Sequence, residues 1–342
     1  MRYVESLNHA LKALLLHHPD VHLLGEDIAD PYGGAFKVTK GLSDAFPGRV
    51  HTTPISEAAI CGVALGMSMR GLRPVLEIMF GDFITLCCDQ LVNGASKFGW
   101  MYNGKTRAPM VLRTPMGGRR GYGPTHSQTL ETLFLNVPGL IIVAPSHCHD
   151  PGRLLTHAVL HEDAPVLFIE NKSLYPKDIF PADTNARLDS FHGRMLPAGN
   201  AAYPTASYSL APDETPDAVL VAYGGMAPLA LNAALEVFLR DELLVEVVIP
   251  SLVKPLDLRP LEQAAARAGR VLVAEESPCA WGWGAEVAAQ LQQSCARSLK
   301  APVARVGAKE LPIASSRRLE EKILPQHTDL TEALNTLIRE WP

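Results

Sequence analysis

One acidic residue, Glu57, stands at the head of an otherwise uncharged segment, TPISEAAICGVALGMSM, at residues 53–69. Small and apolar residues in this segment predict a buried helix. Ser56 would cap that helix, and a carboxylate in its first turn would interact well with the helix dipole. A carboxylate on a buried helix is also partly withdrawn from water, which suits it to exchange a proton with a ring nitrogen. Spacing alone does not decide whether Glu57 only stabilises the start of the helix or also exchanges a proton with a ligand.

A second candidate is the glycine-rich stretch GGRRGYGPTHSQ at residues 117–128. Four glycines and a proline predict a loop after a strand, and ligands bind at the carboxyl ends of parallel strands. His126 ends this loop, although a lone loop histidine is more often a simple hydrogen-bonding residue. Arg119 and Arg120 fit either a solvated pair or a screen for an anionic ligand. The stretch matches neither GxGxxG opening a helix nor the phosphate loop GxxxxGK[ST].

Composition excludes several classes of protein. The chain has 342 residues and a net charge of −5, which argues against a nucleic-acid surface. It lacks a membrane-span pattern, and its first twenty residues fit an amphipathic helix better than a secretion signal. Its six cysteines form no CxxC pair and no metal-ligand spacing. We therefore expect a cytoplasmic protein with no metal site of its own and no membrane or nucleic-acid partner.

Strand-like apolar runs alternate with helical patterns along the chain, which predicts α/β architecture with mostly parallel sheets flanked by helices. The expected domains are 1–180 and 217–342. They are joined by a Pro- and Ala-rich linker or surface loop at 181–216. The expected strands are 21–27, 73–80, 108–115, 140–146 and 165–171 in the first domain, and 218–225, 244–251, 270–277 and 302–309 in the second.

Several motifs together resemble a known family: PISEAAICGVALGMSMRGLRPVLEIMF, FITLCCDQLVNGASK, RTPMGG…THSQ, VPGLIIVAPS, PVLFIENKSLY and APVARVGAKELPIASSRRLEEKILPQ. Their order and spacing resemble the beta subunit of the thiamine-diphosphate-dependent 2-oxoacid dehydrogenase component, which has a transketolase-like fold. The resemblance covers nearly the whole chain and is weakest at 181–216.

The resemblance implies a role for each candidate residue. Glu57 matches the glutamate that contacts the N1′ nitrogen of the cofactor's aminopyrimidine and shares a proton with it. Ile55, in the same motif, and Phe83, in FGDF, fall at positions that contact the cofactor. His126 matches the active-site histidine that serves substrate binding or acyl transfer to a lipoyl group.

The resemblance also implies what this chain lacks. FGDF contains Gly81-Asp82, but the GDG…N motif that holds the metal and diphosphate is absent from the sequence. An alpha subunit would supply Mg²⁺ and the diphosphate half of the site in an α2β2 heterotetramer. A potassium ion in the beta subunit is an open option.

The implied reaction is decarboxylation of a 2-oxoacid with transfer of the acyl group to the lipoyl acyltransferase core. Two alternatives stay open at this point. One is half of a split transketolase-like or acyl/ketol-transferring enzyme of a biosynthetic pathway. The other is a non-catalytic partner-binding subunit, against which the presence of both Glu57 and His126 argues.

Overall fold

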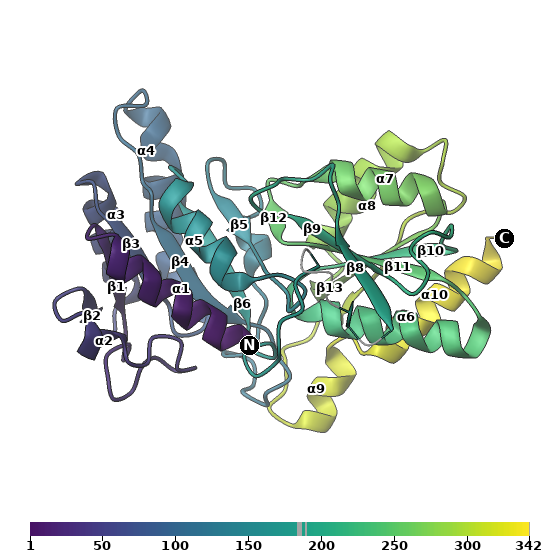
Figure 1. Cartoon of the computed structure of the whole chain (residues 1–342), viewed down its shortest axis with the longest axis horizontal. Helices are drawn as coiled ribbons and strands as arrows, with labels where there is room; N and C mark the ends of the chain where they lie inside the picture. Colours follow the sequence, from purple (N-terminus) through teal and green to yellow (C-terminus); the bar gives the residue numbers. More distant parts are fainter. Residues whose placement is uncertain (183–186, 189, 342) are drawn as a thin grey trace.

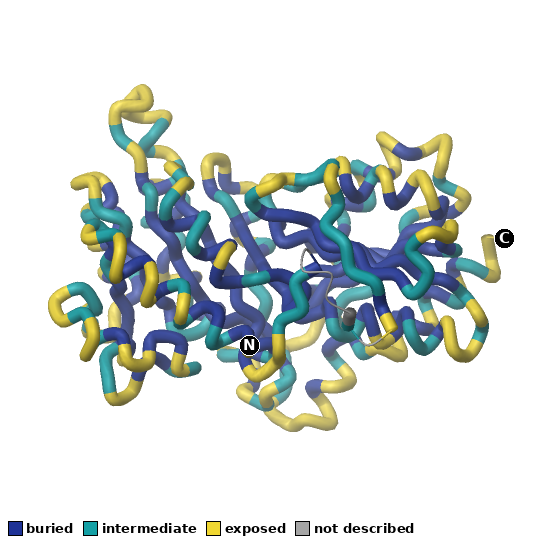
Figure 2. Tube along the Cα trace, viewed as in Figure 1, coloured by how far each residue is buried: buried dark blue, intermediate teal, exposed yellow. Residues whose placement is uncertain are grey.

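Two seven-stranded sheets lie side by side along the long axis of the molecule (Figure 1). The computed structural model describes residues 1–182, 187, 188 and 190–341. The amino terminus lies near the junction of the two sheets and the carboxyl terminus lies beyond the second sheet. Strands of both sheets are mostly buried, whereas exposed residues gather on the loops and outer helix faces (Figure 2).

The first sheet is parallel except at one edge. Its order is β12 (Leu252–Lys254), β5 (Ile141–Val143), β6 (Val166–Asn171), β4 (Val111–Met116), β3 (Arg73–Glu77), β1 (Val21–Gly25) and β2 (Val50–Thr52). The edge strand β12 comes from the second half of the chain and pairs antiparallel with β5. The first sheet is therefore completed by the segment that follows β11.

Helices cover both faces of the first sheet. The helices of this half are α1 (Tyr3–His17), α2 (Leu42–Ala45), α3 (Glu57–Met69), α4 (Ser96–Met101) and α5 (Pro151–His161). One face packs on α1 and α5, with buried leucines such as Leu7, Leu11 and Leu155. The Asp150 side chain caps α5 by accepting from the amides of Gly152 and Arg153, and Pro151 occupies the first turn.

The other face of the first sheet carries α3 and an irregular segment. This segment divides into a 3₁₀ segment η1 (Gly81–Cys87), a π-helical turn η2 (Gln90–Ala95) and α4. Gly94 packs so closely against α3 that an added Cβ would lie 2.8 Å from Leu65 Cδ2. A larger residue at this position would therefore have to displace the Leu65 side chain. The short 3₁₀ segment η3 (Glu131–Phe134) follows later in the chain.

The second sheet mixes parallel and antiparallel pairs. Its order is β14 (Ala304–Ala308), β13 (Val271–Pro278), β10 (Ala218–Ala222), β11 (Val245–Pro250), β9 (Thr205–Ser209), β8 (Phe191–Met195) and β7 (Arg187–Leu188). Helices α6 (Ala227–Asp241) and α10 (His327–Glu340) pack together against one face. Helices α7 (Leu258–Ala268) and α8 (Trp283–Cys295) cover the other, and η5 (Gly224–Met226) and α9 (Arg317–Ile323) complete this half.

The expectation of a linker or surface loop over 181–216 is wrong for β8 and β9. These strands pair antiparallel with each other and, through Tyr208 opposite Val247, with β11. Their sequences, FHGRM and TASYS, are too polar to signal buried strands, and pairing with a strand forty residues away supplies the missing backbone partners. The domain boundaries at 180 and 217 otherwise stay a prediction.

The two halves share one apolar core. A single cluster of buried residues runs from Ile60 on α3 through Ile142 and Val253 to Trp283 on α8. Trp283 donates from its indole N–H to the carbonyl of Val253 at 3.2 Å. Trp281, two residues earlier, is 94% exposed. The paired tryptophans of WGWG therefore have different roles, and only Trp283 joins the two halves.

A buried ion network crosses the middle of the first sheet. The Arg113 guanidinium donates to both carboxylate oxygens of Glu170, at 2.7 and 2.8 Å, and to Glu77 at 2.9 Å. The Tyr175 hydroxyl donates to Glu170 as well. All three charged side chains are at least 93% buried, so each depends on the others for its solvation.

Candidate active site

Glu57 begins α3, and its side chain is only 7% exposed. One face of α3, including Ile60, Cys61 and Ala64, is buried, but Val63 and Met69 are 55% and 42% exposed, so the predicted burial holds for one face only. Ser56 makes no side-chain capping hydrogen bond, so the expectation that it caps this helix is wrong. The Ser56 side chain therefore accepts no hydrogen bond from the first-turn amides of α3.

Glu26 lies beside Glu57 and was missed by the sequence reasoning. It follows β1 directly, is 7% exposed, and accepts a hydrogen bond from the backbone amide of Ser56. Its Oε1 atom has no hydrogen-bond partner among the residues that the structure describes. Burial, and then the neighbouring Glu57 carboxylate, raise the pKa of Glu26. The signal in the sequence was an acidic residue at the carboxyl end of a buried parallel strand.

Phe83 and His126 come together in an aromatic cluster. Phe83 lies on η1, and its ring centroid is 5.2 Å from that of His126. Phe80 packs edge-on against His126 at 4.7 Å and also contacts Tyr122. The Thr125 hydroxyl lies 3.0 Å from His126 Nδ1 and fixes the ring further. The histidine is therefore held between aromatic rings, unlike an ordinary mobile loop side chain.

The segment η1 connects this cluster with Glu57. Its last residue, Cys87, donates from its thiol to the Glu57 carbonyl at 3.4 Å, and η1 packs against α3. Ile55, two residues before Glu57, is 86% exposed. An exposed apolar side chain close in sequence to a buried carboxylate is typical of a surface that a ligand or a second chain covers.

Asp82 has a structural position in this chain. Its Oδ1 accepts from the side-chain amide of Gln128 at 2.8 Å and from the backbone amide of the same residue at 3.3 Å. It therefore ties η1 to the segment just after His126. Within the described residues, no group of three or more His, Cys, Asp or Glu side chains could hold a metal ion.

Lys172 is a cation that contacts this cluster and was also missed. It is fully buried and donates from Nζ to the carbonyl of His126 at 2.6 Å. The ammonium lies 5.2 Å from the centroid of the Phe80 ring. Burial lowers the pKa of Lys172 to about 8, although Asp82 and Glu276 act in the opposite direction.

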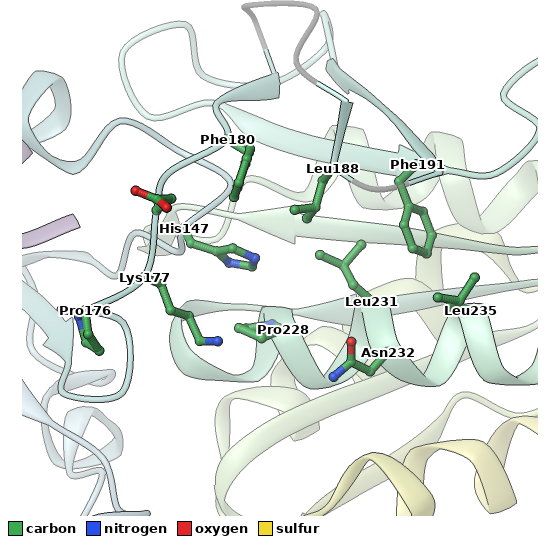
Figure 3. A pocket seen from close by; sticks show the side chains of 11 residues that line it. His147, Pro176, Lys177, Phe180, Leu188, Phe191, Pro228, Leu231, Asn232 and Leu235 are labelled. Atoms are coloured by element: carbon green, nitrogen blue, oxygen red, sulfur yellow. The ribbon is translucent and has the colours of Figure 1, made fainter. Parts of the chain in front are cut away.

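A separate cavity of about 390 Å³ lies between the segment 176–180, strand β8 and helix α6 (Figure 3). Its walls include His147 and Lys177 on one side and Leu231 and Phe191 on the other. Burial lowers the pKa of His147 to about 3, so this imidazole is neutral near pH 7. No predicted site residue is among the described residues that line this cavity, so it is distinct from the candidate active site.

Comparison with known proteins places this geometry in a family. Residues 1–177 match the family model of the transketolase pyrimidine binding domain, and residues 208–330 match that of the transketolase C-terminal domain. The chain is 36% identical over 335 residues to the pyruvate dehydrogenase E1 component subunit beta of Leifsonia xyli subsp. xyli (strain CTCB07), covering 97% of this chain and 93% of that protein. It is 35% identical over 336 residues to the 2-oxoisovalerate dehydrogenase subunit beta of Bacillus subtilis (strain 168), with 97% of each covered.

A solved structure shares the fold. A split gene transketolase in an inactive beta4 tetramer superposes with a TM-score of 0.74, with 21% sequence identity and full coverage of both chains. The two-domain arrangement of helix-flanked, mostly parallel sheets is therefore transketolase-like, which confirms the predicted fold class.

The chain belongs to the family of beta subunits of thiamine-diphosphate-dependent 2-oxoacid dehydrogenases. This confirms the family resemblance and the predicted class of enzyme. Among the described residues, no helix is long and apolar enough to cross a lipid bilayer.

Proposed function

We propose that this chain forms half of an active site that decarboxylates a 2-oxoacid, and that Glu57 is its proton-relay residue. The observation that carries the proposal is the Glu57 carboxylate at the start of a buried helix, beside the partly unpartnered carboxylate of Glu26. Thiamine diphosphate, when bound, supplies the electron sink for decarboxylation. Glu57 would hold a proton at the N1′ nitrogen of its aminopyrimidine ring, and Glu26 would keep that proton near the pair.

The aromatic cluster would position the ring. Phe83 would pack on the aminopyrimidine, and the exposed Ile55 would cover it from the side of Glu57. His126 would bind the substrate carboxylate or assist acyl transfer at the mouth of the site. The orphaned Glu26 oxygen and the exposed apolar Ile55 fit a bound heterocycle that has a polar edge and an apolar face.

An alpha subunit would complete the site. The sequence lacks the GDG…N motif, and the described residues offer no cluster of metal ligands. An alpha chain in an α2β2 heterotetramer would then hold Mg²⁺ and the diphosphate. The exposed Ile55 and Trp100, at 86% and 91%, are suited to an interface with another chain. The proposal also includes a potassium ion in this chain.

The substrate is proposed only as a class. The relatives named for pyruvate and for 2-oxoisovalerate are 36% and 35% identical to this chain, which favours neither acid over the other. A lipoyl acyltransferase core would accept the acyl group. The six cysteines are all free, which supports a reducing, cytoplasmic setting.

The test is Glu57→Gln in the enzyme assembled with its alpha subunit. Gln keeps the size of the side chain but cannot share the proton, and loss of a general acid–base group costs ~10²–10⁴-fold. Hydrogen–deuterium exchange at C2 of the bound cofactor should therefore slow by at least ~100-fold. Loss of the helix-dipole interaction should change stability by only ~0.3–1 kcal/mol, so unfolding would not explain the result.

Glu332→Gln is the matched control, because it makes the same chemical change at an exposed position on α10. It should leave the C2 exchange rate unchanged. A wild-type exchange rate in the Glu57→Gln enzyme with cofactor bound would refute the proton-relay role.

A further inference from the structure

The glycine-rich loop that leads to His126 is anchored to the second half of the chain by two carboxylates. The amide of Gly118 donates to Glu276 Oε1 at 2.6 Å. The amides of Arg119 and Gly121 donate to the two oxygens of Glu320, at 2.8 and 3.2 Å. Glu276 and Glu320 are 5% and 2% exposed, so these charge-assisted hydrogen bonds are shielded from water.

The loop conformation depends on such external anchors. The backbone φ angle is positive at Gly117, Arg119, Gly121 and Gly123. Arg119, at φ 69°, is the one of these four that carries a side chain, and the left-handed conformation is unfavourable for it. The three glycines adopt this region without strain, so Arg119 is the position at which the contacts with the second half have to offset an unfavourable backbone conformation.

The loop lies close against the second half of the chain. A Cβ added to Gly118 would lie 2.5 Å from Leu324 Cδ1 and 3.1 Å from Glu320 Oε1. The Arg119 guanidinium donates to the carbonyl of Pro325 at 2.5 Å and to Gln326 at 3.4 Å. Arg119 is therefore not a freely solvated charge, because its guanidinium binds the segment that follows α9.

The same carboxylates act on the other end of the loop through Lys172. This buried lysine donates to the carbonyl of His126 and interacts electrostatically with both Glu276 and Glu320. Asn171, the preceding residue, donates to Glu276 Oε2 at 3.1 Å. The beginning and the end of the loop are therefore held by one connected set of charges.

We propose that Glu320 and Glu276 are positioning residues, through which the second half of the chain fixes His126 for the reaction. The inference rests on the proposed role of His126. Glu320 is the more direct member, because both of its oxygens accept from loop amides. A glutamine at this position would offer one acceptor, and its NH₂ group would face a backbone N–H.

The experiment uses the assembled enzyme with Glu320→Gln, and Glu321→Gln as the matched control. Glu321 lies on the same helix, is half exposed and pairs with Arg317. Backbone amide exchange of the peptide 117–126 should rise about 10-fold in E320Q and stay unchanged in E321Q. Glu276→Gln is the second variant and should release the amide of Gly118 in the same way.

Kinetics then separate positioning from a general loss of stability. With an artificial electron acceptor, kcat of E320Q should fall about 10-fold, with a smaller change in KM. Adding E320Q to His126→Ala should cause no further loss, because a positioning residue acts only through the group it positions.

Each outcome has a distinct meaning. Unchanged amide exchange in E320Q and E276Q would contradict the claim that these two carboxylates hold the loop. If the losses of kcat in E320Q and His126→Ala multiply in the double variant, Glu320 does not act through His126. Full activity of His126→Ala would overturn the proposed role of His126 and this inference with it.

Discussion

Glu131→Gln tests the electrostatics of the contact between the two halves of the chain. Glu131 lies on η3, is fully buried and accepts a hydrogen bond from the Tyr223 hydroxyl, which follows β10. Burial, opposed by this hydrogen bond and reinforced by Glu275 and Glu276, raises the pKa of Glu131 to about 7. The carboxyl group therefore keeps its proton in the folded chain up to a higher pH than in the unfolded chain.

The direction of the pH effect follows from proton binding. Between the ordinary pKa of 4.5 and about 7, the folded chain binds more protons at this site than the unfolded chain. Stability from this site is therefore fully present below pH 4.5 and is lost as the pH rises through about 7. At ~1.4 kcal/mol for each unit of pKa, the ionised Glu131 costs up to about 3 kcal/mol at pH 8.

Glutamine cannot ionise, so the variant should escape this cost. The Glu131 Oε2 atom has no partner among the described residues, and the glutamine amide placed there would be similarly unsatisfied. The difference in stability between variant and wild type at pH 5 measures the cost of this unsatisfied amide. At pH 8 the free energy of unfolding of the variant, measured relative to wild type, should be higher than at pH 5 by up to about 3 kcal/mol. This corresponds to a relative rise of ~2–5 °C in melting temperature.

Thermal unfolding of both proteins at pH 5 and pH 8 is the assay, with the exposed Glu332→Gln as the control. The control should show the same difference from wild type at both pH values. A Glu131→Gln difference that does not change between pH 5 and pH 8 would refute the raised pKa and its cause.

Two further variants probe the site and the sheet beneath it. His126→Ala should impair acyl transfer to a lipoyl domain more than decarboxylation measured with an artificial acceptor, because the histidine lies at the end of a surface loop. Equal losses in the two assays would instead assign it to substrate binding. Arg113→Leu should destabilise the chain by ~3–5 kcal/mol in denaturant unfolding, because it leaves the carboxylates of Glu77 and Glu170 buried without their cation. Arg317→Leu, which removes a surface pair, should cost less than ~1 kcal/mol, and similar losses in the two variants would contradict the network's importance.

The sequence by itself determined all of the parallel strands except the short edge strand β2, at Val50–Thr52, and it singled out the candidate residues Glu57 and His126. Each of the nine expected strands overlaps an observed one, from β1 at Val21–Gly25 to β14 at Ala304–Ala308. A buried parallel strand is a short continuous apolar run, and such a run is visible in the local sequence. Glu57 was visible for a related reason, because a charge at the head of an uncharged helix stands out against its neighbours.

Only the tertiary structure decided the features that depend on distant partners. β9 is a strand because β11 offers it a backbone edge, and β12 leaves its own half to pair with β5. Glu320 lies about 200 residues from the loop amides that donate hydrogen bonds to it, so no local sequence pattern could predict this contact. A buried carboxylate is favourable only where donors surround it, and those donors are set by the packing of the two halves. Glu57 and His126 could therefore be singled out from the sequence, whereas Glu26, Lys172 and the carboxylates that hold the loop could not.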